Sequence, residues 1–363
     1  MSKVLDYLIL ALFPLFLIPF GAPLGILGLL ILIGLRWILS LENWAQDFKM
    51  WLSLPFVALV AYLFAWTTIT PTVPSLISTI KVIALFAVAF VFTKMRTNRA
   101  TLLTFAGSFL VFSVIFFSGL IKSSFNPNYF GMIVFLSFAW IAKHLRDNIR
   151  SVAGTTLFSV ALALILASHS RSILAALAAF GLLALLRPSE KTKRALFWLA
   201  LVSGIALPAL IMGHVDYRAP LLGKPFFSGR QFLWPYALQA ISHFPLGLGP
   251  DLYIPNLIPT DYAEKGASFH NWYLQFGARF GLLGLCLFLT SLDGLIFSRT
   301  KNGPNRALES SFFIAFMLTQ YFDVHLTENG LVVGLFAVLI FATPSIESPN
   351  KKSSLRSPAR EFS

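Results

Sequence analysis

The stretch LLTFAGSFLVFSVIFFSGLI at residues 102–121 decides the fold class, because it is apolar on every face and carries no charge. A membrane-spanning β-strand would alternate apolar and polar residues, whereas a membrane-spanning helix needs about 20 mostly apolar residues in a row. The stretch has the length and composition of such a helix. We therefore expect an all-α polytopic membrane protein and exclude a β-barrel.

Similar apolar runs recur along the chain, which is 57% hydrophobic and only 12% charged, with a mean hydropathy of +0.76. A soluble protein of this composition would expose far too much apolar surface. The first run follows Lys3 but shows no cleavage site, so we interpret it as a retained helix. We predict twelve spans, at residues 4–20, 21–36, 50–68, 78–93, 102–121, 128–143, 152–167, 172–186, 195–213, 271–297, 308–323 and 330–343.

The positive charges follow the predicted spans. If both termini are cytoplasmic, all but eight of the 28 Lys and Arg residues fall on the inner side, in agreement with the positive-inside rule. The formal net charge of +13 is therefore explained by topology, and nucleic-acid binding has no support. The eight basic residues on the outer, periplasmic half are Lys81, Lys122, Arg171, Arg218, Lys224, Arg230, Lys265 and Arg279.

The spans divide the chain into four parts. Residues 1–213 hold helices 1–9, residues 271–343 hold helices 10–12, and residues 344–363 are expected to form a disordered cytoplasmic tail. Residues 214–270 form one long periplasmic loop rich in Pro, Gly and aromatic residues. Within it, RQFLWPYALQAISHF has near-helical apolar spacing, which predicts an amphipathic helix at the outer interface.

Three arginines on the outer half are candidates for binding an anion. Arg171 in LILASHSRSILAAL stands between two apolar runs, where a buried cation costs a few kcal/mol unless it is paired. It either reaches toward lipid headgroups or holds a phosphate. Arg230 and Arg218 either are solvated loop residues or hold a phosphate in the same way.

His270 begins the stretch SFHNWYLQFGARFGLLG at residues 268–284. Its imidazole either lies at the interface as a helix-capping aromatic or accepts a proton as a general base. Asn271 either caps the following helix or orients the imidazole or a sugar hydroxyl. Asn128 either caps a helix or binds sugar.

A metal or other cofactor is not expected. The only cysteine, Cys286, lies in an apolar run, which excludes an intramolecular disulfide and a cysteine-based metal site. Asp251, Asp261 and Glu264 share the long loop but lack the spacing of metal ligands. The outward arginines and His270 suggest transfer of a group away from a phosphate leaving group. The sequence favours arginines over a metal ion as the groups that stabilise the charge on that phosphate.

The pattern of His270, Asn271, nine residues, Gly281 and Gly284 resembles the histidine and glycine motif of bacterial O-antigen ligases. The blocks SHSRS, SGRQFLW, PLGLGPDLY and FNPNYFG are similar to other outer-face blocks of the wider O-antigen ligase and polymerase superfamily. The resemblance covers residues 125–297, and the predicted twelve-helix topology agrees with it.

The resemblance implies an inverting, metal-independent glycosyltransferase of the GT-C type in the bacterial inner membrane, with its active site on the periplasmic face. Its donor would be a glycan on undecaprenyl pyrophosphate, and its acceptor a hydroxyl such as that of lipid A-core or another glycan. By position, Arg171 and Arg230, with Arg218 as a third, would bind the donor pyrophosphate. His270 would activate the acceptor hydroxyl.

Three other functions stay open at this point. O-antigen polymerases and protein O-oligosaccharyltransferases use similar donors but different acceptors, and the sequence does not identify the acceptor. A transporter with twelve helices is a third possibility. It is disfavoured because few charged residues lie within the spans and the two halves of the chain show no repeat.

Overall fold

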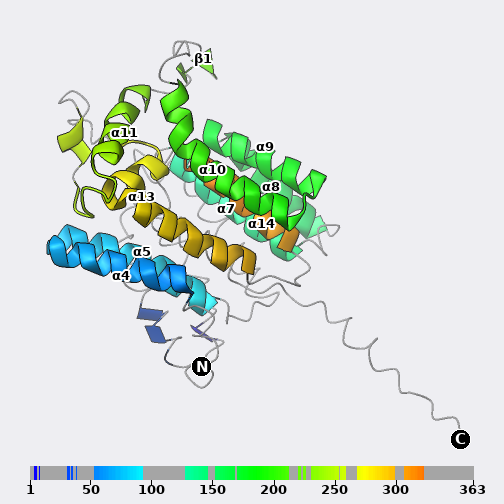
Figure 1. Ribbon diagram of the computed structural model, residues 1–363. Coiled ribbons are helices and arrows are strands. Elements are labelled where there is room, and N and C mark those ends of the chain that lie inside the picture. The colour runs from blue at the N-terminus through cyan, green and yellow to red at the C-terminus, as the bar shows by residue number, and fades with distance from the viewer. Residues whose placement is uncertain are drawn as a thin grey trace, which may run out of the picture.

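The computed structural model describes residues 53–92, 127–145, 152–167, 170–211, 220–221, 224–225, 230–252, 254–258, 268–298 and 306–322, with isolated residues before position 39. The α-helices in these ranges are α4 (Leu54–Ile69), α5 (Val73–Phe92), α7 (Pro127–Leu145), α8 (Val152–Ala167), α9 (Arg171–Leu186), α10 (Glu190–Ile211), α11 (Trp234–His243), α13 (Trp272–Asp293) and α14 (Arg306–Thr319). Figure 1 shows them gathered into one bundle.

Shorter elements connect these helices. Strands β1 (Pro220–Leu221) and β2 (Lys224–Pro225) pair antiparallel as a small hairpin. Two 3-10 turns, η3 (Arg230–Phe232) and η4 (Ile254–Leu257), flank α11, and a π-helical turn, η5 (Gly294–Ser298), continues α13. The fold of the described residues is thus helical apart from this hairpin.

Each predicted span within the described residues coincides with a helix. The agreement is closest at α8, where the predicted and observed bounds are both 152–167. Two helical stretches, Glu190–Leu210 and Trp272–Phe297, are long and apolar enough to cross a membrane. Shorter apolar helices are Leu54–Ile69, Val73–Phe86, Gly131–Lys143, Arg171–Leu186 and Leu308–Thr319. The predicted spans 4–20, 21–36, 102–121 and 330–343 lie wholly or largely outside the described residues.

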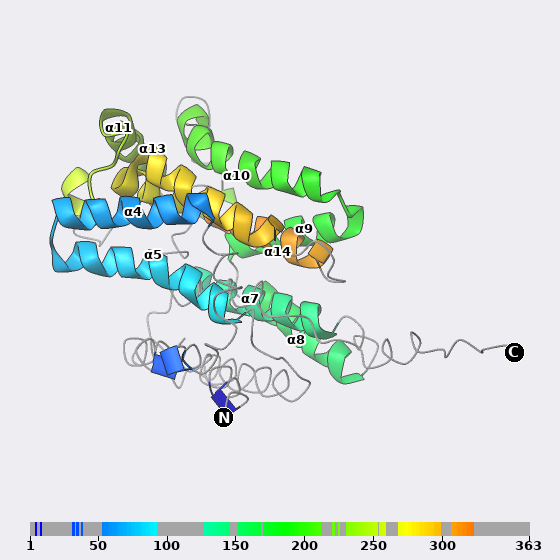
Figure 2. The ribbon, with the colours of Figure 1, turned by 60° about the horizontal axis from the view of Figure 1, so that its bottom comes forward.

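Contacts between side chains set the directions of the helices. Ser170 bonds Asn128 across 42 positions, and the rings of Phe138 and Phe180 meet at the same separation, so α7 and α9 run parallel. Helix α14 runs opposite to both, because its first half contacts the later parts of α7 and α9, as in the Phe180–Phe312 ring pair. Figure 2 shows α7 and α8 on one side of the bundle and α10 on the other.

We call the end of the bundle where α7 and α9 begin and α14 ends the site end. Helix α10 also finishes there, because Lys193 near its start bonds Ser310 of α14, whereas Ser203 bonds Tyr321 just beyond α14. Figures 1 and 2 show α4 and α5 meeting on the side of the bundle where α13 begins beside α11, and Thr72 between them bonds Asp251 of the long loop segment. Six helices therefore have their termini around one region.

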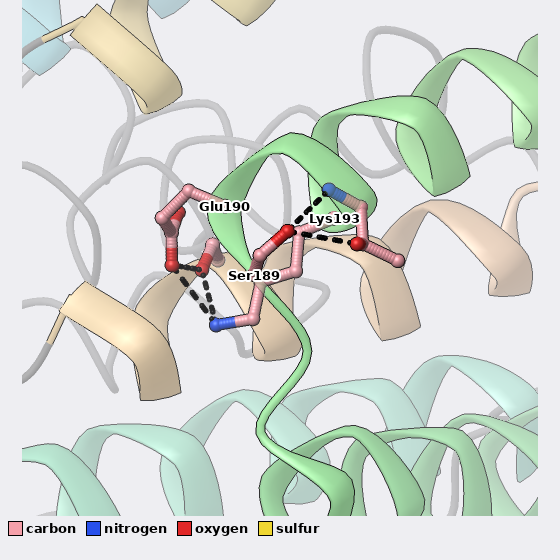
Figure 3. A network of polar contacts seen from close by, with 5 residues as sticks. Ser189, Glu190 and Lys193 are labelled. Carbon is pink, nitrogen blue, oxygen red and sulfur yellow. Dashed lines mark hydrogen bonds and ion pairs between the residues drawn. The ribbon is translucent and has the colours of Figure 1, made fainter.

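Buried ion pairs tie the helices together at the opposite end. The ammonium of Lys143 lies 2.8 Å from Glu309, and that of Lys193 lies 3.0 Å from Glu190 and 3.1 Å from the Ser310 hydroxyl. Figure 3 shows the second group with Ser189 at the start of α10. Both lysines are buried. Removing one partner of such a pair leaves an uncompensated buried charge, at a cost of about 3–5 kcal/mol.

Helix α13 is not the single continuous helix that the sequence predicts over 271–297. Gly281 has φ 68° and ψ 177°, which divides α13 into segments 272–280 and 282–293. The ring centroids of Trp272 and Phe288 are 5.1 Å apart, whereas 16 residues of straight helix would separate their Cα atoms by about 24 Å. The first segment therefore folds back at an angle to the second.

The break in α13 is stabilised by a turn from elsewhere in the chain. Leu282 N–H donates to the Pro245 carbonyl, and Leu248 and Gly249 N–H donate to the carbonyls of Ala278 and Arg279, each over 2.9 Å. The turn at residues 245–249 thus pairs backbone groups that the interrupted helix leaves without their usual partners. This docking explains the break in a run whose apolar residues alone predict an uninterrupted helix.

Gly281 and Gly247 allow the turn at residues 245–249 to lie close to the break in α13. A Cβ on Gly281 would lie 2.3 Å from the Pro245 carbonyl oxygen, and one on Gly247 would lie 2.3 Å from that of Arg279. Both glycines also have positive φ values, 68° and 97°, which side chains disfavour. The glycine that the sequence motif places at position 281 therefore has a structural reason.

Helix α11 packs beside the first segment of α13 in the same direction. Trp234 at its start bonds Phe269 across 35 positions, and Ile241 near its end faces Gly277 at nearly the same separation. Trp234, Ala237, Ala240 and Ile241 form the buried face of α11. The helix lies within the stretch for which the sequence predicts an amphipathic helix.

Candidate functional site

The backbone at His270 is in the left-handed conformation, with φ 49°. This conformation costs a residue with a side chain on the order of 1–2 kcal/mol. It persists only where the neighbouring structure enforces it, and such strain is found most often at functional sites. His270 is partly exposed, and its own N–H donates to the Ser268 hydroxyl over 3.2 Å.

The neighbours of His270 are buried and bound on both sides. The preceding residue, Phe269, is buried and accepts a hydrogen bond from the Trp234 indole at 3.0 Å. On the other side, Trp272 N–H donates to the Gln320 carbonyl at 2.8 Å. These contacts join the start of α11, the start of α13 and the end of α14, and they enforce the strained conformation between them.

Asn271 caps α13 and is itself fully buried. Its side-chain carbonyl accepts from Leu274 N–H at 3.1 Å, and its amide nitrogen donates to the Gly204 carbonyl of α10 at 3.0 Å. Both ends of the amide are thus bonded within the protein. Of the two functional roles that the sequence leaves open for Asn271, this arrangement favours positioning of His270 over direct contact with sugar.

Arg230 lies in η3, immediately before α11. Its guanidinium carbon is 6.0 Å from the centre of the Phe322 ring, at the outer limit of a cation–π contact. Phe322 follows Gln320, whose carbonyl holds Trp272. Arg230 and His270 are therefore both anchored to the end of α14, although 40 positions separate them.

Arg171 is the first residue of α9 and is partly exposed. The residue before it, Ser170, is buried and donates a hydrogen bond to the Asn128 side-chain carbonyl at 2.8 Å. The Ser170 hydroxyl also lies 3.2 Å from that of Ser172. The structure therefore brings together Arg171 and Asn128, which the sequence singles out separately.

The two groups of residues lie at the same end of the bundle. Helices α9 and α14 run antiparallel and meet where Phe180 contacts Phe312. Arg171 precedes Phe180 by nine residues of α9, which corresponds to about 14 Å, and α14 ends at Thr319, about 10 Å past Phe312, with Phe322 three residues beyond it. Arg171 thus comes level with Phe322 and hence with Arg230.

Two other predictions fall partly or wholly outside the described residues. Arg218 lies in the undescribed stretch 212–219. Of Asp251, Asp261 and Glu264, only Asp251 is described, and it accepts a hydrogen bond from Thr72 at 3.2 Å. Within the described ranges, no three His, Cys, Asp or Glu side chains are grouped so that they could hold a metal ion.

Several residues that contact the candidate site residues or their neighbours are not singled out by the sequence alone. Gln320 and Phe322 lie at the end of a predicted span, where nothing in the local pattern distinguishes them. Trp234 has a weak signal, since it follows Arg230 in SGRQFLW. The contacts of all three depend on segments distant in the chain.

The family model described as O-antigen ligase matches residues 156–289. This match supports the O-antigen ligase superfamily over part of the chain. The matched region extends from α8 to most of α13 and includes Arg171, Arg230 and His270, whereas Asn128 lies before it. No curated protein matches the chain.

The match to the O-antigen ligase family and the apolar helices indicate a membrane protein. Proteins with this domain are glycosyltransferase-like enzymes that act as ligases or polymerases on lipid-linked glycans. The match therefore supports a function of the O-antigen ligase or polymerase type.

Proposed function

We propose that the chain is an inverting, metal-independent glycosyltransferase of the GT-C type, which moves a glycan from undecaprenyl pyrophosphate to a hydroxyl acceptor such as lipid A-core. The observation that carries the proposal is the strained and partly exposed His270 in an O-antigen ligase domain. It lies at the bundle end that also holds Arg171 and Arg230.

In the proposed reaction, the imidazole of His270 takes the proton from the acceptor hydroxyl as its oxygen attacks the anomeric carbon of the donor. The bond between that carbon and the pyrophosphate oxygen breaks, and its electron pair leaves with the pyrophosphate. A single displacement of this kind inverts the anomeric configuration. The products are the glycosylated acceptor and undecaprenyl pyrophosphate.

Arg171, Arg230 and Arg218 are proposed to bind the donor pyrophosphate. A guanidinium donates two parallel hydrogen bonds to phosphate oxygens and compensates the negative charge that grows on the leaving group. The common level of Arg171 and Arg230 supports a shared ligand. No divalent cation or other cofactor is assigned a role.

The two asparagines have different proposed roles. Asn271 orients His270 through the start of α13, which its buried side chain holds against α10. Asn128 binds a sugar hydroxyl of the donor, because it is partly exposed and lies beside the residue that precedes Arg171.

In the proposed topology the protein lies in the bacterial inner membrane with both termini in the cytoplasm and the site end facing the periplasm. The basic residues predicted on the inner side support this orientation, since Lys143, Lys193 and Arg194 are all at the opposite end of the bundle. The lipid tail of the donor then stays in the bilayer while the pyrophosphate reaches the site end.

The alternatives are an O-antigen or polysaccharide polymerase and a protein O-oligosaccharyltransferase, with a transporter less favoured. Lipopolysaccharide from a strain lacking the protein distinguishes a ligase from a polymerase. Lipid A-core accompanied by free lipid-linked polymer indicates a ligase, whereas core that bears a single repeat indicates a polymerase.

A purified assay tests the chemistry directly. Protein in nanodiscs is given a lipid pyrophosphate-linked glycan and lipid A-core, in excess EDTA, and the configuration of the new bond is determined. Transfer with inversion is expected. Transfer that stops in EDTA and returns with magnesium or manganese would contradict metal independence, and substrate flux without transfer would favour a transporter.

A further inference from the structure

The turn that docks into the break of α13 exposes two large apolar side chains. Phe244 is 50% exposed and Leu246 is 57% exposed. Pro245, between them, accepts the N–H of Leu282, and Leu282 and Leu283 are themselves exposed on the second segment of α13. The exposed apolar side chains of the turn therefore lie beside those of the second segment of α13.

The depth of this surface follows from α4. The hydroxyl of Tyr62 lies 2.6 Å from the Leu246 carbonyl oxygen and 2.9 Å from that of Phe280. Tyr62 precedes Ile69, the last residue of α4, by seven positions, which corresponds to about 10 Å along the helix. Leu246 is thus about 10 Å below the end of α4 along its axis.

The end of α4 is itself an apolar surface. Ile69 is 70% exposed, and Val73, which begins α5, is 71% exposed. In a membrane protein, side chains of this kind on the outside of a helix face lipid. If lipid covers Ile69 and Val73, Leu246 lies well inside the hydrocarbon layer, whose half-thickness is about 15 Å.

The backbone of the turn also suits a lipid environment, in which each unpaired polar group costs several kcal/mol. The carbonyls of residues 244 and 245 accept hydrogen bonds from Gly247 and Leu282, and those of residues 278 and 279 accept from Leu248 and Gly249. The carbonyls of residues 246 and 280 share the single O–H of Tyr62. The carbonyls of this non-helical stretch are therefore bonded within the protein.

We propose that the turn formed by Phe244, Pro245 and Leu246 re-enters the membrane and inserts into lipid acyl chains on the side of the site end. The segment 214–270, predicted as a periplasmic loop, then dips into the bilayer beside α13. The occupant of the apolar surface is bilayer lipid, because the turn lies beside the exposed leucines of the apolar second segment of α13.

The insertion has a consequence for the site. The turn follows α11 and docks at the end of segment 272–280, while Arg230 and His270 lie at the opposite ends of these two parallel helices. Lipid contact at the turn thus holds α11 and segment 272–280 at the ends that lie opposite to Arg230 and His270. The proposal depends on the membrane location and not on the proposed chemistry.

The test uses nitroxide labels on single cysteines in a Cys286→Ser background, because Cys286 is exposed. Leu246→Cys is compared in nanodiscs with Leu283→Cys on α13 and with Asn256→Cys, an exposed polar position in η4. Phe244→Cys supplies a second site in the turn if the Leu246 variant folds poorly. The measurement is the accessibility of each label to oxygen, which enters hydrocarbon, and to a polar nickel chelate, which does not.

A label at position 246 or 244 should show the oxygen-to-nickel accessibility ratio of position 283, well above that of position 256. A ratio like that of position 256 would place the turn in water and overturn the proposal. Low accessibility to both reagents would also overturn it, because the surface would then be covered by protein, such as a second copy of the chain. Each outcome is independent of glycan transfer.

Discussion

The indole N–H of Trp234 donates a hydrogen bond to the carbonyl oxygen of Phe269 over 3.0 Å, joining the first residue of α11 to the residue before His270. Both residues are buried. The bond connects the segment that carries Arg230 with the segment that carries His270, and its loss should therefore affect stability and transfer together.

Trp234→Phe removes the donor and leaves the buried Phe269 carbonyl without this partner, which should cost about 1–3 kcal/mol of stability. Thermal unfolding of the purified protein in detergent measures the loss. Trp198→Phe is the control, because the Trp198 indole has no hydrogen bond among the described residues. Equal melting temperatures for the two variants would contradict the assigned role of Trp234.

Substitution of His270 should abolish transfer without loss of the protein from the membrane. General-base catalysis contributes about 10²–10⁴-fold, so His270→Ala and His270→Gln should both lose at least that much turnover. His270→Asn is the matched control for folding, because Asn tolerates the left-handed conformation. Near-normal transfer by the Gln variant would show that the side chain orients the acceptor and does not accept its proton.

Arg171→Lys and Arg230→Lys should each lower turnover at saturating donor by on the order of 10²-fold, as does the loss of one hydrogen-bond donor to a developing anion. Donor affinity should change less, because the charge on the leaving group grows during the reaction. If both arginines act on the same phosphates, the double variant should be less impaired than the product of the single defects. Multiplicative losses would assign them to separate sites.

Gly281→Ala should destabilise the protein by at least about 1–3 kcal/mol, because the backbone is left-handed and the new Cβ would meet the Pro245 carbonyl oxygen. Gly181→Ala, in open space on α9, should instead stabilise by about 0.5–1 kcal/mol. Unfolding midpoints compare the two. Equal stability would show that the turn at 245–249 does not dock at this break.

Glu309→Gln should destabilise the protein by about 3–5 kcal/mol, because the ammonium of Lys143 stays buried without its counter-charge. The double variant Lys143→Met with Glu309→Leu removes both charges and should recover most of the loss. Unfolding midpoints of the single and double variants provide the measurement. A double variant as unstable as the single one would show that shape, and not charge, governs this contact.

The location of most helices could be predicted from the sequence. Long apolar runs predict helices in a membrane because the backbone there must bond within its own segment, and α8 begins and ends where its run does. The histidine, the glycines and two arginines could also be selected, since polar or special residues next to apolar runs stand out locally. Their roles remain predictions, but their positions along the chain required no tertiary information.

Other features were decided only by the tertiary structure. The run around Gly281 is compatible with one helix, and only the docking of residues 245–249 divides it. The partner of Asn128 lies 42 positions away, and the carboxylate that neutralises Lys143 lies on α14. These contacts join segments far apart in the chain. A local pattern determines whether a segment is stable as a helix in lipid. It does not determine which distant polar group or turn lies beside that helix.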